Sequence, residues 1–561
     1  MTHFFQEPPQ LKNQYEEDEL LQLYLEWKFS KKELKIIQKD LHRFGKRVVT
    51  DILALAQAAE DNMPRLEQFD PWGNRIDEIK TSAAWKELDR ISAEEGLISH
   101  GYQRKYKELS RLYQLSKLYL FHASSAFYSC PLAMTDGAAR LIELYGDQEL
   151  KHKAFQHIIS QNPDEFWTSG QWMTEKTGGS DVSQSETIAR FEDNEWKLYG
   201  VKWFTSATTS QMTMALARIE EEGKIVPGSK GLSLFYIELR DEAGKLNNIE
   251  ILRLKDKLGT DALPTAELKL NGTKTKLVGE KGQGVKTISS LFNITRIYNA
   301  CCSLSASRRI LVLAKDYAQK RTAFNKKIIQ HPLHNEILSQ AEQDWFIQFM
   351  LVFNLTELLG ADECQKTPVS GLSSEDIAGV LRILTPIAKL FTAKKTLSMT
   401  SELLESFGGA GYIENTRIPR LLRDAQVFPI WEGTTNVLSL DVLRSIAKEN
   451  SLSSLIKYLS LKMKNIDLKL FSQEIDSLMT EMKKTESYFR STSSDEFEPN
   501  ARNISFNLAQ LSCAVFCLEF ASAHPKHKKY TLMAKRYCAQ LKTYFFTDSG
   551  QRANENLEII K

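Results

Sequence analysis

A single glutamate, Glu432, stands in the setting from which the chemistry of this chain is best argued. It lies in the segment Asp424–Arg444 (DAQVFPIWEGTTNVLSLDVLR), between the bulky Trp431 and the flexible Gly433. Two threonines follow and favour the start of a helix, and Pro429 predicts extended chain before the glutamate. A carboxylate held at such a turn loses part of its hydration and is suited to act as a general base. The alternative interpretation is an acidic residue that complements a helix dipole.

Three other stretches carry residues that suit an aromatic cofactor with a diphosphate. They are QWMTEKTGGSD (Gln171–Asp181), KWFTS (Lys202–Ser206) and LESFGGAGY (Leu404–Tyr412). Adjacent glycines let a backbone approach a diphosphate closely, and a flavin ring needs hydrogen-bond donors and an aromatic wall behind it. Together with WEGTTN, these stretches resemble the acyl-CoA dehydrogenase flavoproteins, and in detail the AidB-type branch of that superfamily. The likeness runs from about the N-terminus to Arg444.

The resemblance implies an FAD site built from several separate stretches of the chain. The implied contacts are Gln171, Met173, Thr174, Gly179, Ser180, Trp203, Thr205, Arg321, Phe324, Glu405, Gly408, Gly409, Thr434 and Asn436. In this family Thr174 would lie near flavin N5, whereas Arg321 and Phe324 would reach the cofactor of a second subunit. A homo-oligomer, usually a dimer of dimers, is therefore implied. Much of the family has Gln where this chain has Glu405, and that departure matches the AidB branch.

The same resemblance implies α,β-dehydrogenation of an acyl-CoA thioester. Glu432 would take the α-proton while flavin N5 accepts the β-hydrogen as hydride, and the backbone N–H of Glu432 would help to bind the thioester carbonyl. Some relatives carry the base at the position of Thr295, whose hydroxyl cannot serve as one. The implied substrate-binding residues are Ser180, Arg296, Trp431 and Gly433. Electrons would then pass to an electron-transfer flavoprotein.

Two alternatives stand beside this hypothesis. One is a flavoprotein of low turnover that acts in a stress response by binding acyl groups or DNA. It is favoured by AidB-like details, namely the TEKTGGSD loop, the tryptophan beside the base, Glu405 and a basic C-terminal segment, His524–Lys542. A charged helix face is the ordinary interpretation of that segment, and DNA binding is the weaker one. The other alternative is an acyl-CoA oxidase.

The elements that must position these residues change in type along the chain. Helical periodicity dominates residues 1–165, including Glu33–Ala58, and short alternating segments predict an antiparallel β domain over 166–278. The expected strands are Glu195–Val201, Met212–Arg218, Leu232–Glu238, Glu250–Leu254 and Ala266–Leu270. Helical patterns return over 279–448, which holds the candidate base, and over an extension, 449–561. The predicted fold is α+β and multidomain: an N-terminal helical domain, a central β domain and a C-terminal helical bundle with an added helical extension.

Composition indicates an ordinary soluble protein. The 561 residues carry a net charge of +2, with 26% charged and 42% hydrophobic residues, so net charge favours neither nucleic acid nor membrane binding. The richest apolar run, Trp345–Leu359, contains polar residues and predicts a buried or interface helix instead of a membrane span. Seven irregularly spaced cysteines and an N-terminus without leader features predict a cytoplasmic protein. The isolated histidine pairs predict no metal site.

Overall fold

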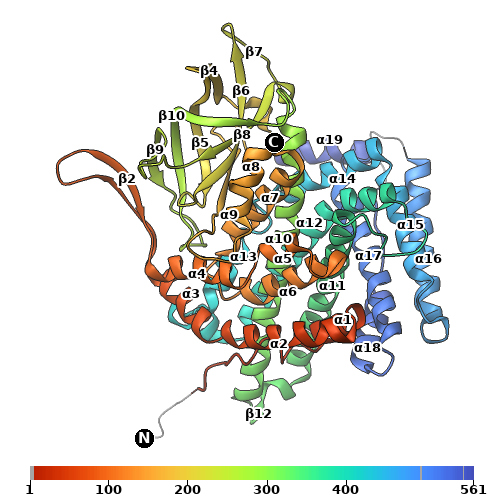
Figure 1. Ribbon diagram of the computed structural model, residues 1–561. Helices are drawn as coiled ribbons and strands as arrows, with labels where there is room; N and C mark the ends of the chain where they lie inside the picture. Colours follow the sequence, from red (N-terminus) through yellow and green to blue (C-terminus); the bar gives the residue numbers. More distant parts are fainter. Residues whose placement is uncertain (1–5, 493–495, 547–548) are drawn as a thin grey trace, which may run out of the picture.

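The N-terminal part of the chain is helical apart from one projecting hairpin (Figure 1). The computed structural model describes residues 6–492, 496–546 and 549–561. The first helices and strands are α1 (Glu19–Lys28), α2 (Lys31–Arg47), α3 (Asp51–Asp61), β1 (Arg65–Phe69), β2 (Arg75–Lys80), α4 (Ala83–Glu94), α5 (Ser99–Gln103), α6 (Ser110–His122), α7 (Ser129–Tyr145), α8 (Gln148–His152) and α9 (Ala154–Ile158). The single helix predicted over Glu33–Ala58 is two helices, because Val48, Val49 and Thr50 are consecutive β-branched residues that disfavour helix.

The β1–β2 hairpin was not predicted from the sequence. Its turn is closed by Asp70, whose carboxylate accepts the backbone N–H groups of Trp72 and Asn74, and by Gly73 with φ +84°. Trp72 at the tip is 89% exposed. The base of the hairpin lies against the central sheet, since Asp77 accepts the N–H of Ile251 at 2.9 Å.

The central β domain is one eight-stranded sheet in which most neighbours are antiparallel. Its strands are β3 (Ser169–Trp172), β4 (Ile188–Glu192), β5 (Glu195–Ser206), β6 (Met212–Glu221), β7 (Lys224–Ile225), β8 (Leu232–Glu238), β9 (Ile249–Leu254) and β10 (Thr265–Val278). All five predicted strands are confirmed. The strands β3 and β4 were not predicted from the sequence, and both pair in parallel with β6. The domain has its own apolar core, which includes Trp172, Phe235 and Leu268.

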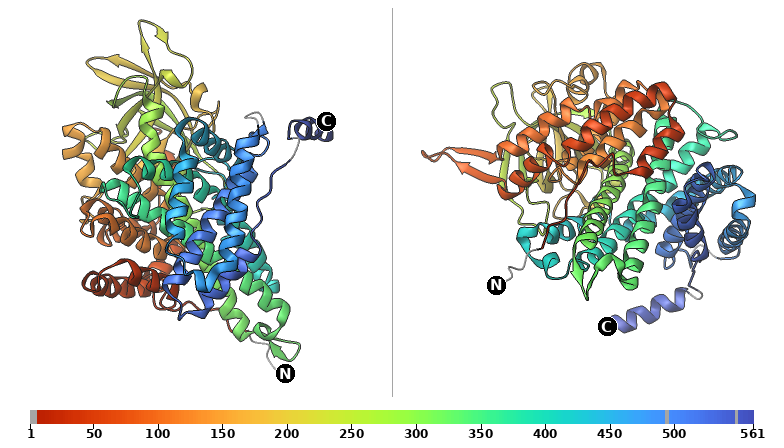
Figure 2. Two further views of the ribbon diagram at one scale, coloured as in Figure 1. Left: turned by 90° about the vertical axis from the view of Figure 1, so that its right-hand side faces the viewer. Right: turned by 90° about the horizontal axis from the view of Figure 1, so that it is seen from below.

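Helices form most of the C-terminal part, and the three longest are α10 (Gly284–Lys320), α11 (Pro332–Glu363) and α12 (Ser374–Glu405). They are followed by α13 (Ile418–Ala425) and α14 (Thr435–Glu449), and two short strands, β11 (Thr322–Ala323) and β12 (Lys326–Lys327), follow α10. The extension adds α15 (Ser451–Met463), α16 (Leu468–Ser491), α17 (Ala501–Ala523), α18 (Lys528–Ala539) and α19 (Ser549–Ile560). α19 stands apart from the other helices (Figure 2). The predicted order of helical, β and helical domains with a helical extension is confirmed.

One helix of the extension corrects the sequence analysis. Among the described residues, α17 alone is long and apolar enough to cross a bilayer by length and composition, so the run Trp345–Leu359 is not the richest candidate. However, 89% of the apolar window of α17 is buried inside the protein. α17 packs against α11 and α14, and it is the central helix of the extension's core.

Candidate active site

Glu432 lies where three distant parts of the chain meet. Its carboxylate accepts a hydrogen bond of 2.5 Å from the hydroxyl of Thr295, on α10, and one of 3.4 Å from the amide of Gln171, on β3. The side chain is half-buried, and the backbone φ is +57°. α14 begins at Thr435, so the predicted turn before a helix is confirmed. Glu432 and Thr295, the two positions at which the resembled family carries its base, are thus in direct contact.

The chain just before the candidate base forms consecutive turns, not the extended segment that Pro429 predicted. α13 ends at Ala425, and the backbone N–H groups of Ile430 and Trp431 both donate to the carbonyl of Val427. Proline restricts the residue before it but also suits a turn, and it has no N–H to contribute to the turn's hydrogen bonds. These turns bring the carboxylate back toward α10.

Replacing Thr295 by Val is expected to slow proton abstraction about tenfold, because the carboxylate loses its short hydrogen bond while the side-chain shape is kept. The measurement is the rate of flavin reduction after anaerobic mixing with acyl-CoA. Thr287→Val is the matched control, since Thr287 also lies on α10 but bonds only to its own helix backbone. Equal rates in the two variants would show that Thr295 does not orient the base.

Arg296, predicted to lie near the substrate, is held in an ion-pair network beside Thr295. It and Arg382 both pair with Asp441 at 2.8 Å, which joins α10, α12 and α14. Burial alone would raise the pKa of Asp441, but the two guanidinium groups lower it below its ordinary value. The Nε of Arg296 is buried and has no hydrogen-bond partner in the described part of the chain. One N–H of Arg296 is therefore left to meet a ligand.

The two predicted cofactor contacts after the base have different settings. Thr434 is the N-cap residue of α14, but its side chain makes no capping hydrogen bond. Asn436 is exposed and accepts a hydrogen bond of 3.3 Å from Arg502 on α17. The C-terminal extension therefore touches the helix that follows the candidate base.

The loop after β3 carries four of the predicted contacts. Met173 is buried and Thr174 half-buried, whereas Gly179 and Ser180 are exposed. The backbone N–H of Trp203 donates to the carbonyl of Thr174 at 2.9 Å, which fixes the loop to β5. The two motifs that the sequence separates are therefore joined by a backbone hydrogen bond.

A buried ion pair that the sequence analysis missed holds this loop in place. The Lys202 ammonium lies 2.6 Å from the carboxylate of Glu175, which also accepts a hydrogen bond from the hydroxyl of Thr187. Burial would raise the pKa of Glu175, but Lys202 and these hydrogen bonds lower it instead. The signal was present, because the two charges lie inside the two stretches interpreted as cofactor motifs.

Thr205 and Trp203 occupy one strand, but only Trp203 has a partly exposed side chain. The hydroxyl of Thr205 donates to the carbonyl of Ala266 at 2.8 Å inside the sheet, and the residue is fully buried. The Lys255 ammonium lies 3.4 Å from the centre of the Trp203 ring. The hydroxyl of Thr205 is thus engaged by the strand partner and not by the site.

A second cluster of predicted contacts lies far from Glu432 in the same chain. Phe324 is 90% exposed, and the rings of Tyr317 and Phe407, 5.0 Å apart, join the ends of α10 and α12. The exposed members of this cluster on the α12 side are Glu405, Gly408 and Gly409. Thr295 and Arg321 are separated by most of α10, roughly 39 Å at the rise of an α-helix. One chain therefore carries two half-sites that cannot contact the same end of one cofactor.

Atoms around Glu432 fit the flavin nucleotide that the resemblance implies. The amide oxygen of Gln171 and the indole N–H of Trp431 are buried without a hydrogen-bond partner in the described residues. A ligand with both donors and acceptors would satisfy the two atoms. At the second half-site, a Cβ placed on Gly408 or Gly409 would meet nothing within 4 Å, so the backbone there is open to a diphosphate.

Two cavities lie near these elements. A cavity of about 770 Å³ is lined by Phe127 and Phe428 among others, and the ring of Phe127 lies 6.0 Å from that of Trp431. Neither Trp431 nor Glu432 lines this larger cavity, so it approaches the turn of the candidate base without including it.

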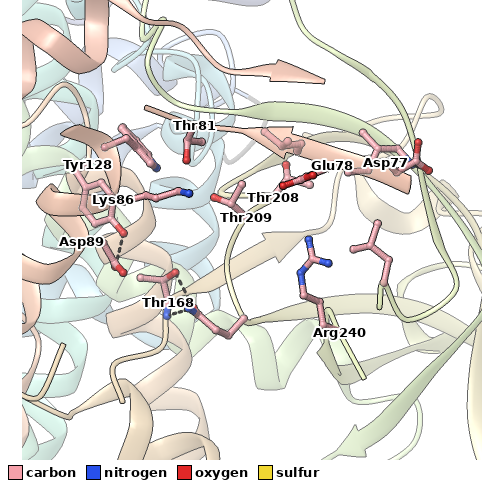
Figure 3. Close-up of a pocket in the computed structure, with 15 residues that line it drawn as sticks. Asp77, Glu78, Thr81, Lys86, Asp89, Tyr128, Thr168, Thr208, Thr209 and Arg240 are labelled. Carbon is pink, nitrogen blue, oxygen red and sulfur yellow. Dashed lines mark hydrogen bonds between the residues drawn. The ribbon is translucent and has the colours of Figure 1, made fainter. Parts of the chain in front are cut away.

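The smaller cavity, of about 250 Å³, lies between the β1–β2 hairpin, α4 and the sheet (Figure 3). Asp89 there accepts a hydrogen bond from Tyr128 at 2.5 Å, and burial raises the pKa of Asp89 to about 6 although Tyr128 opposes the shift. Glu432 does not line this cavity.

Comparison with protein families matches nearly the whole chain. Residues 6–165 match the adaptive response protein AidB N-terminal domain, and 170–273 and 282–447 match the acyl-CoA dehydrogenase middle and C-terminal domains. Residues 450–557 match the acyl-CoA dehydrogenase 11 C-terminal domain-like family.

Individual relatives agree with these matches. The chain is 40% identical over 556 residues to acyl-CoA dehydrogenase family member 11 of Caenorhabditis elegans, covering 96% of this chain and 89% of that protein. It is 27% identical to the putative acyl-CoA dehydrogenase AidB of Escherichia coli (strain K12), over 90% and 87% of the two chains. The crystal structure of C. elegans ACDH-11 in complex with C11-CoA is similar with a TM-score of 0.96 and 38% identity, covering 100% of this chain and 97% of that one.

Proposed function

This chain belongs to the acyl-CoA dehydrogenase superfamily, in its AidB-type branch, and we propose that it oxidises a saturated acyl-CoA thioester to the trans-2-enoyl-CoA with Glu432 as the base. The observation that carries the proposal is the carboxylate of Glu432, held by Thr295 and Gln171 beside two unpartnered buried polar atoms. FAD, when bound, supplies the acceptor for the hydride that leaves Cβ of the substrate. The complex of a similar protein with C11-CoA supports an acyl-CoA as the ligand.

The chain's own residues supply the proton chemistry. The Glu432 carboxylate takes the proton from Cα, and the Thr295 hydroxyl fixes the direction of that carboxylate. The backbone N–H of Glu432 would donate to the thioester carbonyl, where negative charge develops as the proton leaves. The rings of Trp431 and Phe127 would limit the access of water on the substrate side.

The complex of a similar protein with C11-CoA supports an acyl chain of more than a few carbons. The test is anaerobic mixing of the FAD-loaded protein with saturated acyl-CoAs of increasing length while the flavin absorbance is followed. Rapid bleaching with one length class is the expected result. Bound FAD that no thioester bleaches would overturn the proposal.

Such a failure would favour the alternative of an AidB-like flavoprotein with low turnover that binds acyl groups or DNA in a stress response. The basic helix α18 bears on the DNA part of this alternative. Its Lys529 pairs with Glu342 at 2.5 Å and its Lys535 lies over the ring of Phe471, which reduces the free charge of the helix. A charged helix face therefore remains the better supported interpretation of His524–Lys542.

We further propose that the active form is a homo-oligomer, with an electron-transfer flavoprotein as its electron acceptor. The separation of the two half-sites along α10 supports the oligomer, because Arg321 and Phe324 are too far from Glu432 in one chain to serve the same cofactor end. An exposed fraction of 90% for the Phe324 side chain also supports a partner surface there.

A further inference from the structure

A buried lysine forms a hydrogen bond to the turn that contains Glu432. Lys389 lies in the middle of α12, and its side chain is fully buried. The Lys389 ammonium donates to the backbone carbonyl of Gly433 at 2.6 Å. Lys389 is therefore hydrogen-bonded to the residue directly after the candidate base.

Lys389 differs from the other fully buried lysines of the described chain. Lys117, Lys202 and Lys462 each have a carboxylate within 3.0 Å, but no ion pair of Lys389 within 4 Å occurs among the described residues. Burying an ammonium that is not paired in this way is costly, so its position calls for a role beyond packing.

The charged groups that face Lys389 belong to the active site. Burial lowers the pKa of Lys389 to about 7, the charge of Glu432 opposes this shift, and Arg296 on α10 adds to it. The ammonium is thus in the electrostatic field of both the candidate base and Arg296.

The peptide that Lys389 grips is conformationally unusual. Glu432 has φ +57° and Gly433 has φ +102°, so two successive residues are left-handed. A Cβ on Gly433 would come within 2.9 Å of Leu438, which explains the glycine. A non-glycine residue such as Glu432 keeps this conformation only when its surroundings stabilise it. The hydrogen bond from Lys389 to Gly433 is one such stabilising contact.

We propose that Lys389 is a positioning residue for dehydrogenation: by clamping the Gly433 carbonyl, it fixes the turn from which Glu432 directs its carboxylate and its backbone N–H. The inference rests on the proposed role of Glu432. Lys389 itself need not touch the substrate, and acts through the peptide group after the base.

The test is Lys389→Met, which keeps the length and the apolar stem of the side chain and removes the donor. In anaerobic single turnovers the rate constant of flavin reduction at saturating acyl-CoA is expected to fall about ten- to hundredfold, while the dissociation constant of the acyl-CoA changes little. Lys394→Met is the matched control: it removes a half-buried lysine of the same helix that does not contact the turn, and its rate should equal that of the wild type. An unchanged rate in Lys389→Met overturns the proposal.

A second measurement is independent of turnover. Hydrogen exchange of the amides over residues 428–436 is expected to be several-fold faster in Lys389→Met than in the wild type, and unchanged in Lys394→Met. Unchanged exchange in Lys389→Met would also overturn the clamp. Faster exchange in a protein whose wild-type form bleaches with no acyl-CoA would support the clamp and reject the catalytic role of Glu432, so the two failures are distinguishable.

Discussion

Glu432→Gln is expected to lower the rate of acyl-CoA dehydrogenation by about three to four orders of magnitude. The amide has the shape of the carboxylate and still accepts from the hydroxyl of Thr295, so the turn and the binding of FAD should be preserved. The amide cannot take the α-proton, and the structure offers no replacement at the other family position, because Thr295 is a threonine. The loss should therefore fall on the chemical step and not on substrate binding.

The measurement is anaerobic flavin reduction by the acyl-CoA that bleaches the wild type fastest. Glu402→Gln is the control, since Glu402 is an exposed glutamate on α12, and its rate should match the wild type. FAD content and acyl-CoA affinity are determined for both variants. A Glu432→Gln variant that retains a tenth or more of the wild-type rate would show that another group removes the proton.

The local sequence around Glu432 predicted its turn, and the family resemblance carried by the three other stretches was needed to interpret it as the candidate base. A carboxylate before two threonines and an apolar helical pattern predicts a turn and a helix start, and both are observed. The strands were predicted for the same reason, since alternation is visible in five or six residues. The three domain types follow from these local periods.

Contacts between distant segments could not be predicted in this way. The hydrogen bond of Thr295 to Glu432 spans 137 residues, and the grip of Lys389 on Gly433 spans 44. Nothing in the sequence near Lys389 distinguishes it from the lysines that follow it on α12. The engagement of the Thr205 hydroxyl by Ala266 likewise depends on which strand lies beside β5.

Errors of local prediction have equally specific causes. Pro429 indicated extended chain, but the turn bonds to Val427 prevail because the segment must reverse between α13 and α14. The β1–β2 hairpin was missed because its two short strands, joined by a turn that holds Pro71 and Gly73, lie in a part of the chain where helical periodicity dominates.

The largest effect on stability is expected from Arg111→Met, which should lower the free energy of unfolding by about 3–5 kcal/mol. Arg111 on α6 is almost fully buried and pairs with Asp136 of α7 at 2.9 Å and with Glu363 of α11 at 2.8 Å. Methionine fills much of the same volume but leaves two carboxylates in the interior without their cation. The cost therefore comes from unpaired charge and not from a cavity.

Arg190→Met is the control for this experiment, because Arg190 pairs with Glu220 at the surface and is 43% exposed; its loss should cost less than about 1 kcal/mol. Chemical denaturation of the variants gives the comparison. Neutralising one of the stranded carboxylates, in Arg111→Met combined with Glu363→Gln, should restore part of the lost stability. If Arg111→Met and Arg190→Met unfolded at the same denaturant concentration, the buried ion pairs of Arg111 would not stabilise the packing of α6 against α7 and α11.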